Sequence, residues 1–324
     1  MQRRQFLQCG AAAALAASGL ARAQGPWPQK PIRLVVPFPP GGGTDATSRL
    51  IAEKLTTLAR WTLVVDNKPG AGGNIGLDMV AKAVPDGYTI GMGQAANLAI
   101  NPGLYPKMPF DPLKDFTAIA GVAAQPVVLV VRQDSPFRTL ADFLRQARAR
   151  SGETGIAQAG NGTVGHLAGE MLARRAGVRV MQVPYKGAGP AMNDLLGGQV
   201  PAYFGNTVSV MPQLAAGSIR ALAVTSAQRL SALPSVPTVA EQGFAGFEAT
   251  TWLGLVAPAG LPADITAKLS ATTLQVLARP DVQQRLKQEG SVATPTSPAA
   301  FAAHIRAEHA KWGALIREAQ IKLS

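Results

Sequence analysis

The chain has 324 residues, of which 47% are hydrophobic, a formal net charge of +12 at pH 7 and one cysteine. Its lysines and arginines form no block longer than a pair and are not interleaved with aromatic residues, so we expect no nucleic-acid partner. A single cysteine excludes an internal disulfide and a cysteine-based zinc site.

Residues 1–23 have the layout of a secretory leader. Arg3 and Arg4 supply the positive start, residues 10–20 are apolar and small, and an A-x-A cleavage site ends at Ala23. The apolar stretch is shorter than the roughly 20 residues of a membrane span, so we expect cleavage near Ala23 and export to the periplasm. The arginine pair resembles the twin-arginine signal, with an ordinary Sec leader as the alternative. Cys9 would leave with the leader.

Apolar strands alternate with amphipathic helices along the mature chain, which predicts an α/β fold built on mainly parallel sheets. The first series comprises strands at 32–37, 61–66 and 88–92 and helices at 46–58 and 75–83. The second series comprises strands at 126–131, 155–158, 180–184, 202–204 and 221–225 and helices at 140–150, 166–176, 190–196 and 211–216. An apolar strand at 253–257 then precedes helices at 263–277, 280–289 and 298–319.

About 300 mature residues exceed what one hydrophobic core usually serves, so we expect two domains. If the strand at 253–257 returns to the first domain, that lobe is discontinuous. Lobe 1 then comprises residues 24–127 and 249–324, and lobe 2 comprises residues 128–248. The two connecting strands between them would form a hinge.

Three glycine-rich loops stand directly before predicted helices, at residues 37–45, 69–74 and 160–166. Glycines permit positive φ and close backbone approach, and helix N-termini present unpaired N–H donors that suit a carboxylate or phosphate. The loops are therefore candidate anion cradles. The alternative is a set of tight turns, in which Thr44 or Asp45 merely caps a helix.

Signatures of catalysis, cofactors and metals are scarce. Residues 160–165 match G-x-G-x-x-G, but the acidic residue expected about 20 positions later is missing. We find no P-loop, no G-x-S-x-G elbow and no metal-ligand spacing among the histidines, so we expect no cofactor and no metal. The enzyme alternative, a periplasmic enzyme acting on a small organic acid, would rely on Asp45 or His166 as its acid or base.

Several segments together resemble one family, the Bug proteins. They are residues 37–45, 67–76, 85–88, 101–105, 161–167, 183–191 and 234–238. Bug proteins are the extracytoplasmic substrate-binding components of tripartite tricarboxylate transporters. The resemblance covers nearly the whole mature chain, in order. It implies a two-lobed Venus-flytrap fold that holds a small anionic organic solute, and inner-membrane transporter subunits as partners. We also expect a monomer.

The resemblance also implies a set of ligand-binding residues in the cleft. In lobe 1 they are Phe38, Pro40, Gly41, Gly42, Thr44, Asp45, Gln94, Ala95 and Asn97. In lobe 2 they are Asn161, Gly162, Thr163, His166 and Asn206. Many relatives have Tyr at the position of Phe38 and serine-rich residues in the second loop. The chain departs from both patterns, which leaves the identity of the carboxylate ligand open.

Overall fold

The computed structural model describes residues 27–323. The chain divides into two compact units, one of residues 1–30 and one that begins at Pro31. The predicted leader and Cys9 lie outside the described residues.

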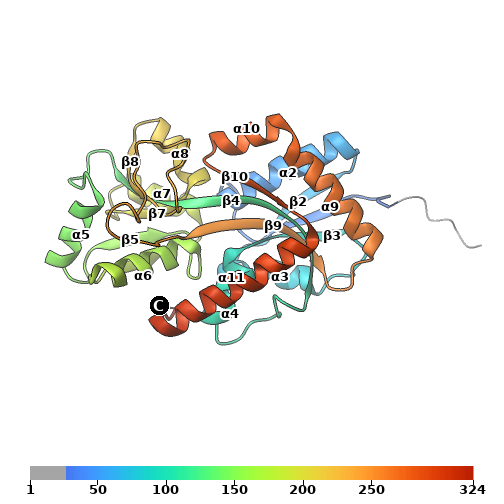
Figure 1. The fold of residues 1–324 in the computed structure, drawn as a ribbon, viewed down its shortest axis with the longest axis horizontal. Helices are drawn as coiled ribbons and strands as arrows, with labels where there is room; N and C mark the ends of the chain where they lie inside the picture. Colours follow the sequence, from blue (N-terminus) through green and yellow to red (C-terminus); the bar gives the residue numbers. More distant parts are fainter. Residues whose placement is uncertain (1–26, 324) are drawn as a thin grey trace, which may run out of the picture. The chain divides into compact units, whose positions relative to one another are not determined.

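Lobe 1 is a sheet with helices packed against it (Figure 1). Its strands are β1 (Ile32–Val36), β2 (Leu63–Asn67), β3 (Thr89–Gln94), β9 (Thr250–Pro258), β10 (Val292–Thr296) and the first part of β4 (Phe116–Arg132). Its helical segments are α2 (Gly43–Ala59), η2 (Ala71–Gly73), α3 (Asn74–Ala81), η3 (Ala96–Ile100), α4 (Asn101–Leu104), α9 (Ala263–Ala278), α10 (Pro280–Gln288) and α11 (Pro298–Ala319).

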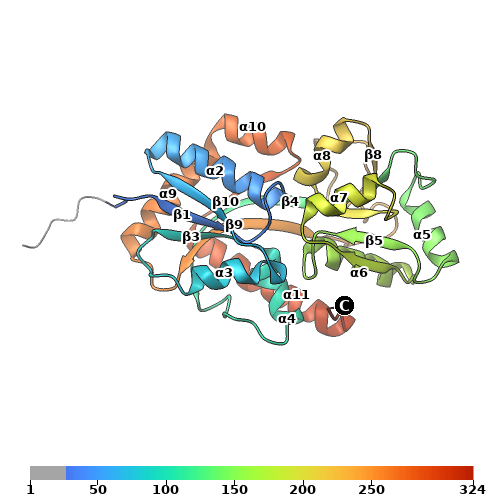
Figure 2. The same cartoon turned by 180° about the vertical axis from the view of Figure 1, so that it is seen from behind.

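Lobe 2 continues the same strand β4 into a second sheet, seen from the other side in Figure 2. Its other strands are β5 (Gly155–Gln158), β6 (Met181–Pro184), β7 (Tyr203–Asn206) and β8 (Ile219–Val224). Its helices are α5 (Leu140–Ala149), α6 (Val164–Ala176), α7 (Ala188–Leu196) and α8 (Thr207–Ala215).

Both sheets are mixed, which corrects the expectation of mainly parallel sheets. The parallel pairs are β1 with β2, β1 with β3, β5 with β6, and β5 with β7. Strand β4 instead pairs antiparallel with β7, β8, β9 and β10, and β3 pairs antiparallel with β9. The expectation of parallel pairing therefore holds for β1, β2, β5 and β6, whereas the long strands β4 and β9 pair antiparallel.

Strand β4 is longer than its sequence pattern predicts. Only residues 127–131 form a continuous β-branched and leucine run, which is typical of a strand buried on both faces. The preceding alanine- and glycine-rich residues pair with β9 from Phe116 to Pro126. Strand β10 was not predicted, and its burial pattern explains why: Val292 is exposed, and the strand shows no regular alternation.

Strands β4 and β9 carry the chain between the lobes, and Thr225 ties them together on the lobe 2 side through its buried hydroxyl and its backbone. Thr225 accepts a hydrogen bond from the backbone N–H of Val127 at 3.0 Å and lies within bonding distance of the carbonyl of Ala249 at 2.5 Å. Its side chain is fully buried. The two crossings are thus fixed to one another. The residue boundaries of the two lobes remain a prediction.

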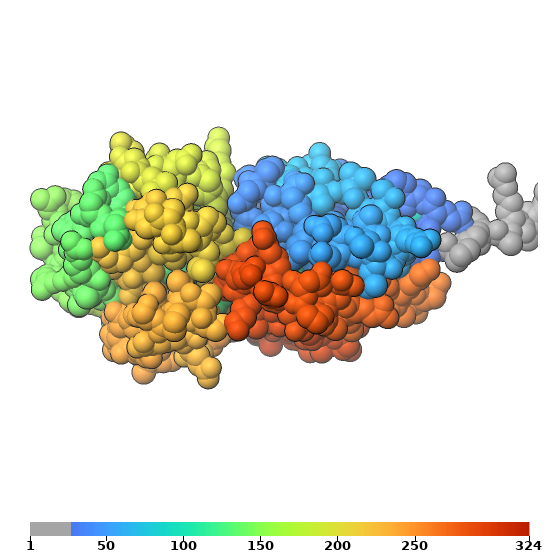
Figure 3. Space-filling view, turned by 90° about the horizontal axis from the view of Figure 1, so that it is seen from above, coloured from blue at the N-terminus to red at the C-terminus, as the bar shows by residue number. Residues whose placement is uncertain are grey.

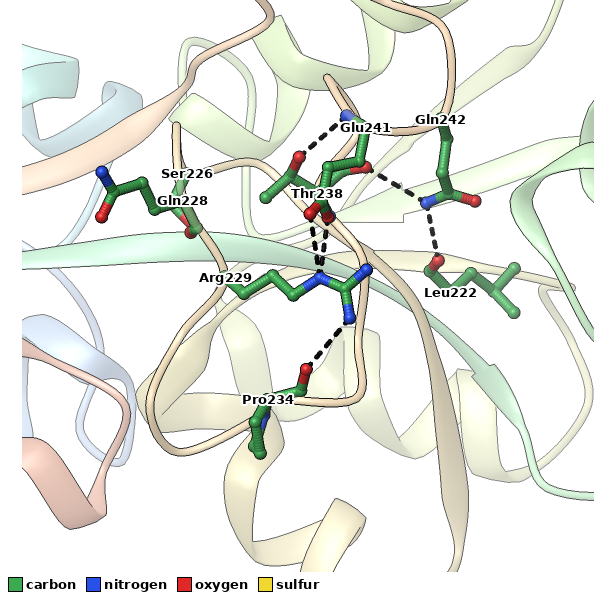
Figure 4. A network of polar contacts seen from close by, with 8 residues as sticks. All are labelled: Leu222, Ser226, Gln228, Arg229, Pro234, Thr238, Glu241 and Gln242. Carbon is green, nitrogen blue, oxygen red and sulfur yellow. Dashed lines mark hydrogen bonds and ion pairs between the residues drawn. The ribbon is translucent and has the colours of Figure 1, made fainter.

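The loop between β8 and β9 is held by a polar network around Arg229 (Figure 4). The Arg229 Nε donates to both carboxylate oxygens of Glu241, at 3.0 and 2.9 Å. Glu241 and Thr238 also cap one another reciprocally: the Thr238 N–H donates to the carboxylate at 2.7 Å, and the Glu241 N–H donates to the Thr238 hydroxyl at 2.9 Å. This network gives the loop a defined path back to the hinge.

Candidate functional site

A cavity lies where the two lobes meet, with an open volume of ≈ 50 Å³. That is room for only a few water molecules. In Figure 3 the green-to-gold surface of lobe 2 abuts the blue and orange surface of lobe 1. The lobe 1 lining is Phe38, Pro39, Gly42, Gly43, Thr44, Gln94 and Thr251, and the lining from lobe 2 and its junction is Val127, Ala159, Thr163, Val164, Gly165, Gly187, Ala188, Tyr203, Phe204 and Asn206.

Four helix N-termini contribute to this lining. Gly43 begins α2, Val164 begins α6, Ala188 begins α7, and Asn206 is the N-cap of α8. The N-terminal N–H groups of a helix lack intrahelical acceptors and carry partial positive charge. Among the described residues, no charged side chain lines the cavity. The partial positive charge that these helix N-termini bring to the lining suits an anion.

The first glycine-rich loop owes its shape to Asp45, which does not line the cavity. The buried carboxylate accepts from the Gly41 N–H at 3.0 Å, from Arg49 Nε at 3.0 Å and from Asn67 Nδ2 at 2.9 Å. Burial raises the pKa of Asp45, but the hydrogen bonds from Arg49, Gly41 and Asn67 outweigh it and lower the pKa below its ordinary value. Asp45 is thus an ionised loop anchor, a poor candidate for a general acid.

The lobe 2 loop is shaped by the start of α6. The Thr163 hydroxyl accepts from the His166 N–H at 3.4 Å as the N-cap of this helix. The His166 Nδ1 in turn accepts from the Gly162 N–H at 3.3 Å. Burial lowers the pKa of His166 to about 4. The imidazole is therefore neutral at physiological pH and supports the loop from behind.

The structure brings six of the fourteen predicted site residues to the cavity lining. They are Phe38, Gly42, Thr44, Gln94, Thr163 and Asn206. Pro40 and Gly41 lie exposed outside the lining, and Ala95 and Asn97 are buried beyond Gln94. Asp45, Asn161, Gly162 and His166 also lie outside the lining. Most of these residues therefore belong to the loops that carry the lining residues.

The start of α7 is one part of the lining that the predicted residues do not include. Gly187 and Ala188 line the cavity, and Gly187 has φ +117, a conformation that favours glycine. The segment Tyr185 to Pro190 carries the same strand–glycine–helix signal as the other loops. That signal could have predicted this fourth N-terminus. The aromatic lining residues Tyr203 and Phe204 lie on β7 and have no comparable signal.

The cleft loops of the two lobes are in close contact. A Cβ atom added to Gly187 would lie 3.0 Å from Pro39 Cγ, and one added to Gly72 would lie 3.0 Å from the Asn161 carbonyl. A Cβ atom added to Gly162 would lie only 2.1 Å from Asn101 Oδ1. These glycines allow the cleft walls to meet.

Burial of His166 makes stability depend on pH. Its pKa rises from about 4 in the folded state to an ordinary value near 6.5 when the chain unfolds. The unfolded state therefore binds the extra proton, and stability is lost as pH falls from 6.5 towards 4, by roughly 3 kcal/mol at most. We expect His166→Gln to reduce this slope. Urea unfolding between pH 4 and 7 measures it, and parallel curves for the two proteins would contradict the assignment.

Within residues 27–323 no group of three or more His, Cys, Asp or Glu side chains is placed to hold a metal ion. No helix in the described part of the chain is long and apolar enough to cross a bilayer.

Comparison with known proteins gives consistent matches. Residues 47–321 match the family model described as "Tripartite tricarboxylate transporter family receptor". The chain is 36% identical to the protein BugT of Bordetella pertussis over 92% of this chain and 91% of BugT. Two solved structures from Rhodopseudomonas palustris are similar over all of their length. Rpa4515 with adipate is 37% identical with a TM-score of 0.89 over 92% of this chain, and MatC with bound malate is 32% identical with a TM-score of 0.85 over 90%.

Proposed function

Because the chain belongs to the tripartite tricarboxylate transporter receptor family, we propose that it captures a small carboxylate between its lobes in the periplasm. The observation that carries the proposal is the convergence of four helix N-termini on a cavity without charged side chains among the described residues. Each hydrogen bond from such a donor to a carboxylate contributes roughly 1.5 to 3 kcal/mol. Four or five of them are sufficient for micromolar binding after ordering costs.

The candidate ligand residues are the six predicted ones that line the cavity, together with Gly43, Gly165, Gly187 and Ala188. Two similar structures hold adipate and malate, which are both dicarboxylates. A cavity of ≈ 50 Å³ is too small for such a molecule. We therefore expect the lobes to separate when such a molecule enters. The protein would deliver its ligand to inner-membrane transporter subunits, as a monomer and without altering it chemically.

The test uses adipate and malate as probes, with adipamide as a neutral control of the same length as adipate. We expect one of the dicarboxylates to raise the midpoint of thermal unfolding, because a ligand at 100 times its Kd stabilises by about 2.7 kcal/mol. Adipamide should have no effect. Mass spectrometry of the incubated probe should return it unchanged. A response to adipamide equal to that of adipate, or a chemically altered probe, would contradict the proposal.

A further inference from the structure

Helix α6 connects the cavity to the C-terminal end of the chain. Its first residues, Val164 and Gly165, line the cavity. Its last turn carries Arg174 and Arg175, and it ends at Gly177 in the left-handed conformation. α6 packs on the lobe 2 strands β5, β6 and β7, so it moves with that lobe. Figure 1 shows α6 and the C-terminal part of α11 in the same region of the molecule.

Arg174 reaches from lobe 2 to the end of α11, which packs on η3 and α4 of lobe 1. Its Nη1 donates to the carbonyl of Ala319, and its Nη2 donates to the carbonyl of Glu318 at 3.3 Å. The last carbonyls of a helix have no intrahelical donor and carry partial negative charge. A guanidinium with two parallel donors matches them both in geometry and in charge.

The chain beyond α11 extends this contact. Gln320 ends the helix with φ 50, and the Ile321 N–H then donates back to the Ile316 carbonyl at 3.1 Å. Ile321 and Leu323 are partly buried against the core. A groove of ≈ 350 Å³ beside Arg174 is lined from lobe 2 by Met171, Val178 and Val180 and from lobe 1 by Leu315 and Ile321. Side chains of both lobes thus meet here, at a distance from the cavity set by the length of α6.

We propose that Arg174 is a positioning residue for ligand capture, which fastens lobe 2 to the end of α11 when the cleft walls meet. The fastening forms in the arrangement in which the Gly162 and Gly187 loops contact lobe 1. An interaction made in only one of two arrangements shifts the equilibrium by its own free energy. The rigid helix α6 places the ligand-facing N–H groups and the fastening on one body. This inference rests on the proposed function for its link to a ligand.

The matched control is the neighbouring residue. Arg175 Nη1 donates to the carbonyl of Ala245 at 2.9 Å, and its guanidinium lies over the Phe247 ring. Both of these partners belong to lobe 2. Arg174→Ala and Arg175→Ala therefore each remove an exposed arginine bound to a carbonyl, but only Arg174→Ala removes a link between the lobes. Arg174→Lys retains the charge and loses the paired donors, so it should have an intermediate effect.

The first readout is the rate at which adipate or malate dissociates, whichever binds the wild type more tightly. We expect Arg174→Ala to raise this rate threefold to tenfold and to leave the association rate unchanged. We expect Arg175→Ala to match the wild type. If Arg174 had only a structural role, both variants would unfold at a lower temperature. The ratio of the association rate to the dissociation rate would then stay at the wild-type value in both.

The second readout needs no ligand. Cysteines placed at the exposed Lys107 in lobe 1 and Glu153 in lobe 2 accept spin labels, whose separation reports the arrangement of the lobes. We expect Arg174→Ala to shift the distance distribution away from that of the wild type, and Arg175→Ala to leave it unchanged. Equal distributions and equal dissociation rates in the two variants would overturn the inference. If neither adipate nor malate binds the wild type, the proposed function is wrong. The distance distributions alone then test whether Arg174 holds the lobes together.

Discussion

Replacing Gly162 with alanine is expected to weaken binding of adipate or malate at least tenfold, without unfolding the protein. Gly162 has φ +76, and a Cβ atom there would lie 2.1 Å from Asn101 Oδ1 in the opposite lobe. The methyl group would therefore keep the cleft walls apart, and the helix N-termini of the two lobes could not hold one carboxylate together. A tenfold loss corresponds to about 1.4 kcal/mol.

Gly152 is the matched control for this substitution. It has φ +83, and a Cβ atom there would have no neighbour within 4 Å. Alanine in the left-handed region costs roughly 1 to 2 kcal/mol at either site. Gly152→Ala should therefore lower the free energy of unfolding, measured with denaturant, by a similar amount. Its affinity for adipate or malate, measured by calorimetry, should match that of the wild type. If the two variants bind equally well, contact between Gly162 and Asn101 plays no part in capture.

Replacing Gly254 with alanine is expected to cause the largest loss of stability among the substitutions considered, about 3 kcal/mol. Gly254 lies in β9, between β3 and β4. A Cβ atom there would lie 2.0 Å from Phe301 Cζ and 2.7 Å from the Ala120 carbonyl. Phe301 is buried at the start of α11 and packs edge-on against Trp252. The ring and the strand would both have to move.

A second substitution tests this explanation. Phe301→Leu removes the ring atoms that the new methyl group would meet, so the double variant should recover part of the stability lost by Gly254→Ala. Gly189→Ala, in helix α7 with nothing within 4 Å of its Cβ position, should not destabilise the protein. Chemical denaturation of the wild type, Gly254→Ala, Phe301→Leu and the double variant measures the coupling energy between the two positions. Strictly additive losses for Gly254→Ala and Phe301→Leu would show that the ring is not the obstacle.

The sequence predicts the longer helices and most strands because their apolar periodicity is local, and it does not predict the short segments η3 and α4. It does not predict pairing across the hinge, because the register of β4 with β9 depends on residues more than 100 positions apart. Strand β10 was missed for a related reason. It lies at the edge of lobe 1, exposes Val292 and contains a proline, so its sequence lacks the alternation that marks a half-buried strand.

The glycine-rich loops illustrate the same division within the site. Their composition predicts that the backbone approaches a ligand, and the loops of α2 and α6 do supply part of the cavity lining. Composition does not distinguish the glycines that line the cavity from those that only shape the loop. Gly41 has φ +83 and lies outside the lining, Gly42 has an ordinary φ of −85, and Gly43 lies against Asn206 of lobe 2. The loop is shaped by Asp45 contacts within lobe 1, and the packing of Gly43 depends on Asn206 of lobe 2, so neither difference follows from composition.

The tie that Thr225 makes between Val127 and Ala249 limits how the lobes can move. Thr225 bonds both crossings through its hydroxyl and its backbone, so sliding one strand lengthwise past the other would break these hydrogen bonds. Rotation about an axis through the tie remains, because it changes backbone dihedral angles at the crossings and leaves the hydrogen bonds intact. The mouth of the cleft would then swing through a wide arc while its base hardly moves. We therefore expect an opening of this kind to admit molecules of different lengths through one entrance and to leave the depth of the binding site unchanged.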